Sequence, residues 1–156
     1  MKHLLWQYGD TNLVVVYAST RVDIQSGDLV FLVYEGAAAY AANVLEIAPT
    51  LAAANKYDAL SAIFLGVAMG GSTGGTPEKI RVATTGVFEY RCAEADYDVG
   101  DLVVPTLDAA QRVEPVHGPP GAACRAIGRV VERSPAASWI KIAIESAIMQ
   151  TGIRRP

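Results

Sequence analysis

The stretch Ser26-Gly27-Asp28-Leu29-Val30 decides the fold, because it returns later in the chain as Val99-Gly100-Asp101-Leu102-Val103. In both copies a Gly-Asp pair, typical of a tight turn, is followed at once by apolar residues that favour a strand. A pattern that recurs within two longer stretches is the signature of an internal repeat. The sequence therefore predicts two similar β units, each opened by the same turn.

Three further pairs of segments match in the same order along the chain. The matched pairs are residues 41–46 with 109–114, 65–67 with 127–129, and 80–83 with 140–143. We therefore expect each unit to run from the Gly-Asp turn through two strands to a glycine-marked third strand and an alternating fourth strand. The repeat units cover about residues 26–90 and 98–148 and together form one small barrel or sandwich.

Short runs of Val, Ile, Leu and aromatic residues dominate the chain, so the sequence predicts an all-β fold with one short helix. The helix is expected over residues 50–61, with Thr50 as its cap. Strands are expected at residues 13–17, 29–34, 44–47, 63–68, 80–83, 86–90, 102–104, 126–131 and 139–144.

A length of 156 residues indicates a single domain. We expect the β domain over residues 15–150 and a short tail over 151–156. Residues 1–14 are either an N-terminal arm or the first strand of the domain.

The composition excludes several classes of partner. Thirteen Lys and Arg against sixteen Asp and Glu give a net charge of −3 without a basic stripe, which argues against nucleic acid. No apolar run approaches the roughly 18 residues that span a bilayer, so no membrane partner is expected. Cys92 and Cys124 lack C-x-x-C spacing and are expected to be free thiols. Because 51% of the residues are hydrophobic, we expect further burial in a homo-oligomer.

No motif in the sequence anchors catalysis, so we expect no enzyme, no cofactor and no metal. The glycine-rich segment at residues 70–76 lacks the Lys-Ser/Thr that ends a phosphate-binding loop, and is expected to be a mobile hairpin loop. The carboxylates at residues 94–101 lack the central glycine and final glutamate of a calcium loop. His3 and His117 come without a nucleophile motif such as G-x-S-x-G.

The motifs, taken in order, resemble those of the tailed-phage capsid decoration or cement proteins. The segments that carry the resemblance are residues 1–3, 9–11, 24–30, 64–68, 85–89, 99–103 and 126–130. The resemblance implies a mostly β structural protein, often a trimer, that is made in the host cytoplasm and binds the exterior of the capsid in the virion. There it would bridge neighbouring major capsid subunits and stabilise the shell. The insertion at residues 35–61 departs from the shorter members of the family.

The N-terminal segment supplies the candidate capsid contacts, because it combines large apolar side chains with a cationic start. The alternative is that these residues form the first strand of the domain. The candidate contacts are Lys2, His3, Leu4, Leu5, Trp6 and Tyr8.

Two other classes of function stay open. A small-ligand barrel, for example one that binds carbohydrate, would use aromatic side chains as stacking platforms. The candidates for these platforms are Tyr34, Tyr40, Tyr57 and Trp139. An enzyme of unrecognised type would need perturbed carboxylates in a cleft around Asp96 and Asp98.

Overall fold

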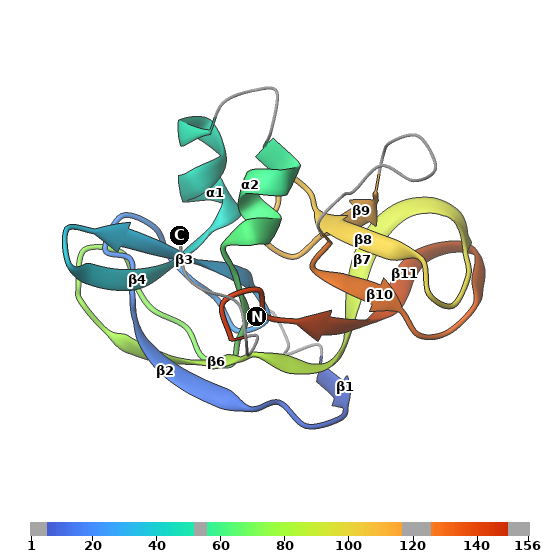
Figure 1. Ribbon diagram of the computed structural model, residues 1–156, viewed down its shortest axis with the longest axis horizontal. Helices are drawn as coiled ribbons and strands as arrows, with labels where there is room; N and C mark the ends of the chain where they lie inside the picture. The colour runs from blue at the N-terminus through green and yellow to red at the C-terminus, as the bar shows by residue number, and fades with distance from the viewer. Residues whose placement is uncertain (1–5, 52–55, 117–125, 150–156) are drawn as a thin grey trace.

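In the computed structural model, which describes residues 6–51, 56–116 and 126–149, the first Gly-Asp turn leads into the second of five strands that form a barrel (Figure 1). Its strands are β2 (Leu13–Ala18), β3 (Leu29–Glu35), β4 (Ala38–Asn43), β5 (Phe64–Ala68) and β6 (Lys79–Ala83). They form a closed barrel in the order β2-β4-β3-β5-β6, in which β2 pairs parallel with β4 and antiparallel with β6. We call it barrel 1.

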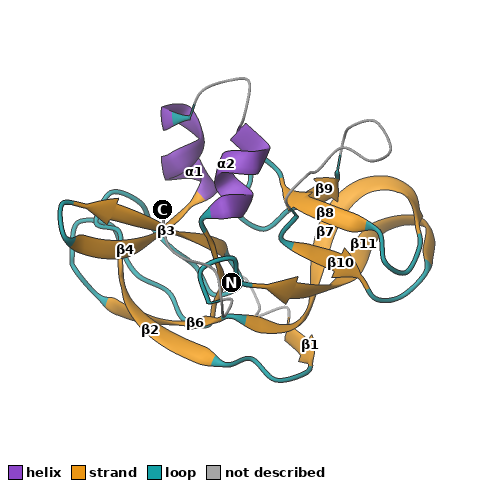
Figure 2. Cartoon of the chain, viewed as in Figure 1, coloured by secondary structure: helices purple, strands orange, loops and turns teal. Residues whose placement is uncertain are grey.

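The second Gly-Asp turn leads into a sheet with the same succession of pairings. Its strands are β1 (Trp6–Tyr8), β7 (Thr85–Tyr97), β8 (Leu102–Pro105), β9 (Val113–Pro115), β10 (Gly128–Val130) and β11 (Ser134–Glu145). The order β7-β11-β10-β8-β9 corresponds to β2-β6-β5-β3-β4, with β1 added at the edge. A parallel bridge between Arg91 and Arg112 brings β7 beside the start of β9, as β2 lies beside β4. This second unit is a six-stranded sheet, joined at its far side by that isolated bridge and not closed like barrel 1, and we call it barrel 2 for its equivalent strand order. The predicted mainly β fold with an internal repeat is confirmed (Figure 2).

The two Gly-Asp turns are equivalent in detail. In each turn the aspartate carboxylate accepts a hydrogen bond from the backbone N–H three residues earlier, at 3.0 Å for Asp28 and 2.8 Å for Asp101. The preceding glycines adopt the same left-handed conformation, with φ of 95° at Gly27 and 94° at Gly100. The Gly-Asp pair recurs because both turns need a positive φ followed by a local side-chain acceptor.

The glycine in the third strand of each unit marks a close approach between two strands. A Cβ atom at Gly66 would overlap the carbonyl group of Ala83, and a Cβ atom at Gly128 would overlap that of Ala143. Ala83 and Ala143 occupy the same place in the alternating fourth strands. The glycine recurs in both units because the close approach of the two strands leaves no space for a side chain.

One of the sequence matches is wrong in register. The pairing aligns Ala41 with Val113, since Ala41 pairs with Leu32 and Val113 pairs with the equivalent Pro105. The sequence match instead aligns Ala41 with Ala109. The chain advances nine positions from Leu32 to Ala41 and eight from Pro105 to Val113, so the two hairpins are nearly equal in length. The sequence match required a much shorter second hairpin and is therefore out of register.

The segment at residues 44–47 was expected to be a strand and is instead the helix α1 (Val44–Ile47). The side chain of Asn43 caps it by accepting a hydrogen bond from Leu45 N at 3.1 Å. Val44 and Ile47, one turn apart, are both buried. A cap and a spacing of three residues thus outweigh the β propensity of Val and Ile.

The expected helix at residues 50–61 also differs from the structure. Thr50 ends a 3-10 turn (Ala48–Thr50), where its hydroxyl donates to the Ile47 carbonyl at 2.7 Å, so it is not the cap of a following helix. The helix itself is α2 (Lys56–Ala62), and residues 52–55 lie outside the described part of the chain. The described residues therefore contain two short α-helices where the sequence predicted one.

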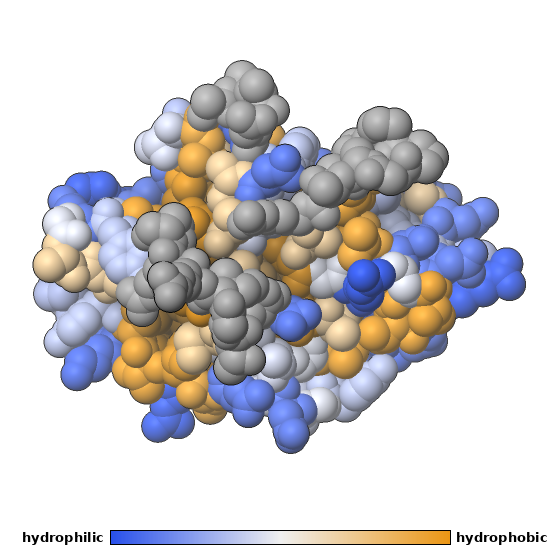
Figure 3. All heavy atoms as spheres, viewed as in Figure 1, coloured by the Kyte–Doolittle hydropathy of each residue, from blue (hydrophilic) through white to orange (hydrophobic). Residues whose placement is uncertain are grey.

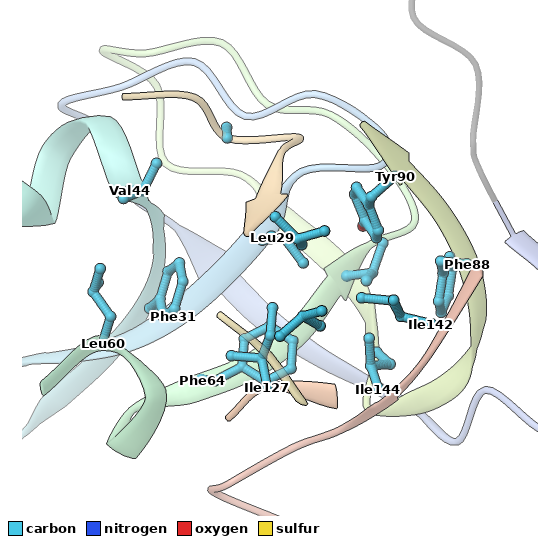
Figure 4. Packing of buried hydrophobic residues seen from close by; sticks show 14 of the residues in the cluster. Leu29, Phe31, Val44, Leu60, Phe64, Phe88, Tyr90, Ile127, Ile142 and Ile144 are labelled. Atoms are coloured by element: carbon cyan, nitrogen blue, oxygen red, sulfur yellow. The ribbon is translucent and has the colours of Figure 1, made fainter. Parts of the chain in front are cut away.

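A shared hydrophobic core joins the two barrels. Leu29, Phe31 and Phe64 point outward from barrel 1 and meet the interior of barrel 2, where Phe88 and Ile142 lie (Figure 4). Residues on the opposite faces of the same strands fill barrel 1 as a second cluster. The alternation predicted for the fourth strand of each unit is confirmed, since its inward residues are buried: Ile80, Val82, Ile140 and Ile142.

Tyr90 ties the two barrels together through one buried hydrogen bond. Its hydroxyl donates to the Gly27 carbonyl at 2.8 Å, and burial, with the nearby Asp28 carboxylate, raises the pKa of Tyr90 well above its usual value. We expect Tyr90→Phe to lower the free energy of unfolding by about 1–2 kcal/mol at pH 7. Urea denaturation measures this change.

The same bond makes a pH-dependent contribution with a defined sign. Because the pKa of Tyr90 is higher in the folded state, its contribution is complete below the unfolded pKa of about 10 and falls as the pH rises above it. The stability difference between the wild type and Tyr90→Phe should therefore shrink between pH 7 and pH 11. An equal difference at both values would contradict this assignment.

Candidate interaction surface

The described end of the N-terminal segment is an exposed edge strand. β1 pairs antiparallel with β7, with Trp6 opposite Phe88 and Tyr8 opposite Val87. The Trp6 side chain is 44% exposed and that of Tyr8 is 52% exposed, although both are large and apolar. Of the predicted contacts, Trp6 and Tyr8 are therefore available on the surface as strand residues, and Lys2, His3, Leu4 and Leu5 lie outside the described residues.

A second group of exposed apolar side chains lies on β2, the next strand along the chain, in barrel 1. Leu13, Val15 and Tyr17 alternate outward along β2, where all three are exposed, and the residues between them pack toward the barrel interior. Figure 3 shows hydrophobic residues gathered over the lower left of the molecule, where β2 and β6 run. On the adjoining strand β6 the outward residues are the exposed Lys79 and Arg81. The surface is thus apolar with a cationic border, and we call it the β2 face.

A cleft of about 1000 Å³ lies between the two barrels. Its walls come from the first Gly-Asp turn, from the loop before β9, and from the middle of β7 and β11. The lining residues that bear polar or aromatic groups are Asp23, Gln25, Asp28, Asn43, Arg91, Cys92, Asp108, Gln111, Arg112, Ser138 and Trp139.

Asp28 is a buried carboxylate that links the barrels beside this cleft. Gln111 Nε2 donates to its Oδ1 atom at 2.8 Å, and Asn43 Nδ2 lies at 3.4 Å from Oδ2, which also accepts the turn N–H of Gln25. The same Gln111 side-chain amide donates to the Ser26 carbonyl at 3.2 Å. Since its acceptor positions are used within the protein, Asp28 holds the structure and is not poised to act on a bound molecule.

Trp139 is the aromatic group that this cleft presents. Its side chain is 40% exposed, and the Arg91 guanidinium lies 5.2 Å from the ring centroid in a cation–π contact. The structure does not bring the other expected platforms to this cleft. Tyr34 lies near the end of β3, Tyr40 lies on β4, and the hydroxyl of Tyr57 on α2 is hydrogen-bonded with Glu114, which together with burial raises the pKa of Tyr57 to about 12.

The expected acidic loop is partly built into the fold. Asp96 Oδ1 accepts from Ala136 N at 2.7 Å, and Asp98 lies 3.4 Å from Arg133. Among the described residues, no group of three or more His, Cys, Asp or Glu side chains is placed to hold a metal ion. Cys92 is buried, which raises the pKa of its thiol, and Cys124 and His117 lie outside the described part.

The glycine-rich loop at residues 70–76 is fastened to the segment before the first Gly-Asp turn. Ile24 and Ser72 exchange two backbone hydrogen bonds, of 3.0 and 2.8 Å, and Gly74 N donates to Asp23 Oδ1 at 2.6 Å.

No helix within the described ranges is long and apolar enough to cross a membrane.

No protein-family model matches the sequence, and no curated protein matches it. Among solved structures, the fold is similar to the N base of the head fibre gp8.5 of bacteriophage phi29. The alignment covers 85% of this chain and 94% of that chain, with a TM-score of 0.48 and 15% sequence identity.

Sequence reasoning proposed Trp6 and Tyr8 as contacts, and the structure shows that both are exposed; the sequence did not point to the β2 face. The run from Leu13 to Tyr17 is continuously apolar, and such a run is typical of a strand buried on both sides. The available signal was on the partner strand, where Lys79 and Arg81 alternate with buried residues and mark an exposed side. Only the pairing of β2 with β6 places the two patterns on one face.

Proposed function

We propose that the chain is a structural protein attached to the head of a tailed phage, and more narrowly a decoration (cement) protein. In this role it binds the outside of the capsid, bridges neighbouring major capsid subunits and stabilises the shell, without catalysis. The resemblance of its motifs to the decoration proteins supports this proposal. The same resemblance supports a homotrimer as the working form.

The exposed aromatic and apolar side chains of β1 and β2 carry the proposal. Trp6 and Tyr8 remain on the surface while both barrel interiors are already filled by other residues. Large exposed apolar groups indicate a protein-binding site, and aromatic residues are the most common anchors of such sites. A capsid offers many identical sites, so modest contacts of this kind can hold a small protein through avidity.

Binding to heads tests this assignment. Purified protein is mixed with empty heads of the phage that encodes it, and the bound fraction is measured by co-sedimentation. We expect the wild type to coat the heads and the variant without residues 1–8 to lose decoration. The double substitution Trp6→Ser, Tyr8→Ser should weaken binding by about 30-fold or more, as expected for the loss of about 2 kcal/mol at an aromatic anchor.

A matched control separates this contact from general surface polarity. Val99→Ser removes an apolar side chain that is 67% exposed in the turn before β8 and should leave binding unchanged. Circular dichroism and thermal unfolding check that each variant folds. If the truncated protein still coats heads at wild-type occupancy, the N-terminal segment is not the anchor. If the wild type does not bind heads at all, the decoration assignment is wrong.

A carbohydrate-binding barrel is the second candidate, and the position of Trp139 in the cleft favours it. An exposed indole ring beside polar side chains suits a sugar ring. A saturable rise in melting temperature with a soluble oligosaccharide, lost in Trp139→Ala, would support this function over capsid binding.

A further inference from the structure

The repeat places a matching row of surface residues on each barrel. In barrel 1, Tyr17 on β2 lies opposite Tyr40 on β4 and opposite Lys79 on β6. We call these three residues row 1. They cross three neighbouring strands at one level of the barrel.

Row 2 is the equivalent row of barrel 2. Arg91 on β7 lies opposite Arg112, just before β9, and opposite Trp139 on β11. The strand order and the register make Arg91 equivalent to Tyr17, Arg112 to Tyr40, and Trp139 to Lys79.

Each row contains one cation–π pair, and the strand position that supplies the cation in one row supplies the aromatic ring in the other. In row 1 the Lys79 ammonium lies 5.3 Å from the centroid of the Tyr17 ring, and in row 2 the Arg91 guanidinium lies 5.2 Å from the Trp139 ring. The cation comes from the fourth strand of the unit in one row and from the strand beside it in the other. Both barrels therefore have a cation–π pair at equivalent positions, although the residues at these positions differ.

Both rows are open to a partner and are cationic. Tyr17 and Trp139 are 51% and 40% exposed, and the three cations lie on the surface. The rows themselves contain Lys79, Arg91 and Arg112 and no carboxylate. Carboxylates do lie nearby, because Glu46 and Glu35 act on Tyr40 of row 1, and Asp23 and Asp108 line the same cleft as row 2. An aromatic ring beside a cation, as in each row, is complementary to a protein group that presents a carboxylate beside apolar atoms, and in row 2 such a group would enter the cleft.

From this equivalence we infer that each row docks on one copy of the same head-shell protein, so that one chain joins two neighbouring copies. The inference rests on the proposed function and deepens it, because it names the residues through which one chain would bridge two shell subunits. Two equivalent sites on one rigid chain suit two identical surfaces of a repeating lattice. Each site contacts carboxylate-bearing positions of its own copy, and the duplication of the barrel supplies the second contact.

Matched charge reversals in the two rows test the inference in the full-length protein. The variants are Lys79→Glu in row 1, Arg91→Glu in row 2, and the double variant. Arg133→Glu is the control, since Arg133 is highly exposed and lies outside both rows. The measurements are the apparent affinity for heads at low and high salt, and the temperature at which decorated heads open. Thermal unfolding of the isolated proteins checks that each variant folds.

Each single reversal should weaken binding by a similar factor of about 10²-fold, the avidity lost with one of two linked contacts. The double variant should bind more weakly than either single variant, because only the N-terminal contact through Trp6 and Tyr8 remains, and the control should bind like the wild type. At saturation, single variants should occupy heads but fail to raise their opening temperature, because one contact cannot bridge. The affinity of the wild type should fall as salt is raised.

Two results would overturn the inference while leaving the proposed function in place. If only one of the two reversals weakens binding, the chain docks through a single barrel. If a single variant at saturation still protects heads as well as the wild type, stabilisation does not need two contacts. Failure of the wild type to bind heads would instead remove the proposed function and the inference with it.

Discussion

Replacing Gly66 by alanine should lower the free energy of unfolding by about 3 kcal/mol or more, because the new methyl group has no space beside the carbonyl of Ala83. The backbone of β5 or β6 must move apart, which disturbs the closed barrel and the core on both sides of it. For a chain of this size the loss corresponds to a fall in melting temperature of about 6–12 °C. Gly128→Ala should have a similar effect, since its Cβ would meet the equivalent Ala143 carbonyl.

Gly70 provides the matched control for both substitutions. A Cβ atom there would meet nothing within 4 Å, and the residue needs no positive φ, so Gly70→Ala should change stability by less than about 0.5 kcal/mol. Urea and thermal unfolding of the three variants give the comparison. If Gly66→Ala were as stable as Gly70→Ala, the close approach of β5 and β6 would be wrong.

The two turn aspartates should differ strongly in spite of their equivalent geometry. Asp28→Ala should cost about 3 kcal/mol, because Asp28 is buried and its loss leaves the side-chain amide of Gln111 and the turn N–H of Gln25 without their acceptor. Asp101→Ala should cost about 1 kcal/mol, because Asp101 is exposed and water can replace it at the N–H of Asp98. Equilibrium denaturation measures both losses.

Asp28→Asn separates the loss of hydrogen bonds from the loss of volume. It keeps one acceptor oxygen and the size of the side chain, so its cost should fall between those of Asp28→Ala and the wild type. Equal losses for Asp28→Ala and Asp101→Ala would mean that the link between Asp28 and Gln111 contributes nothing to the junction of the barrels.

Much of the fold could be predicted from the sequence because the repeat carries residues with strict backbone roles. The Gly-Asp turns and the alternating strands at residues 79–83 and 139–144 each depend on a few positions that only certain residues suit. β4 (Ala38–Asn43) was missed, because its alanines have little strand preference and become buried only when the barrel closes. β9 is only three residues long and has little pattern of its own, so the similar letters at residues 109–114 gave a match that is out of register with the pairing.

Less of the candidate surface could be predicted. Trp6 and Tyr8 were identified because large apolar residues near a cationic terminus are unusual on their own. The rows could not be found in this way, because Tyr17 and Tyr40, like Arg91 and Arg112, meet through parallel contacts between segments far apart in the chain. A sequence alone does not give the register of such contacts. Its apolar run from Leu13 to Tyr17 is also typical of a buried strand, which hides the exposed position of Tyr17.

The core shared by Leu29, Phe31 and Phe64 with barrel 2 has a mechanical consequence. Duplicated domains joined by a flexible tether can adjust the distance between their binding sites, at an entropic cost. Here the outer wall of one half is part of the interior of the other, so the halves cannot slide or swing without exposing apolar surface. The distance between the two rows is therefore fixed by the shared core. Under the proposed docking, the chain would join only those neighbouring sites that lie at this distance.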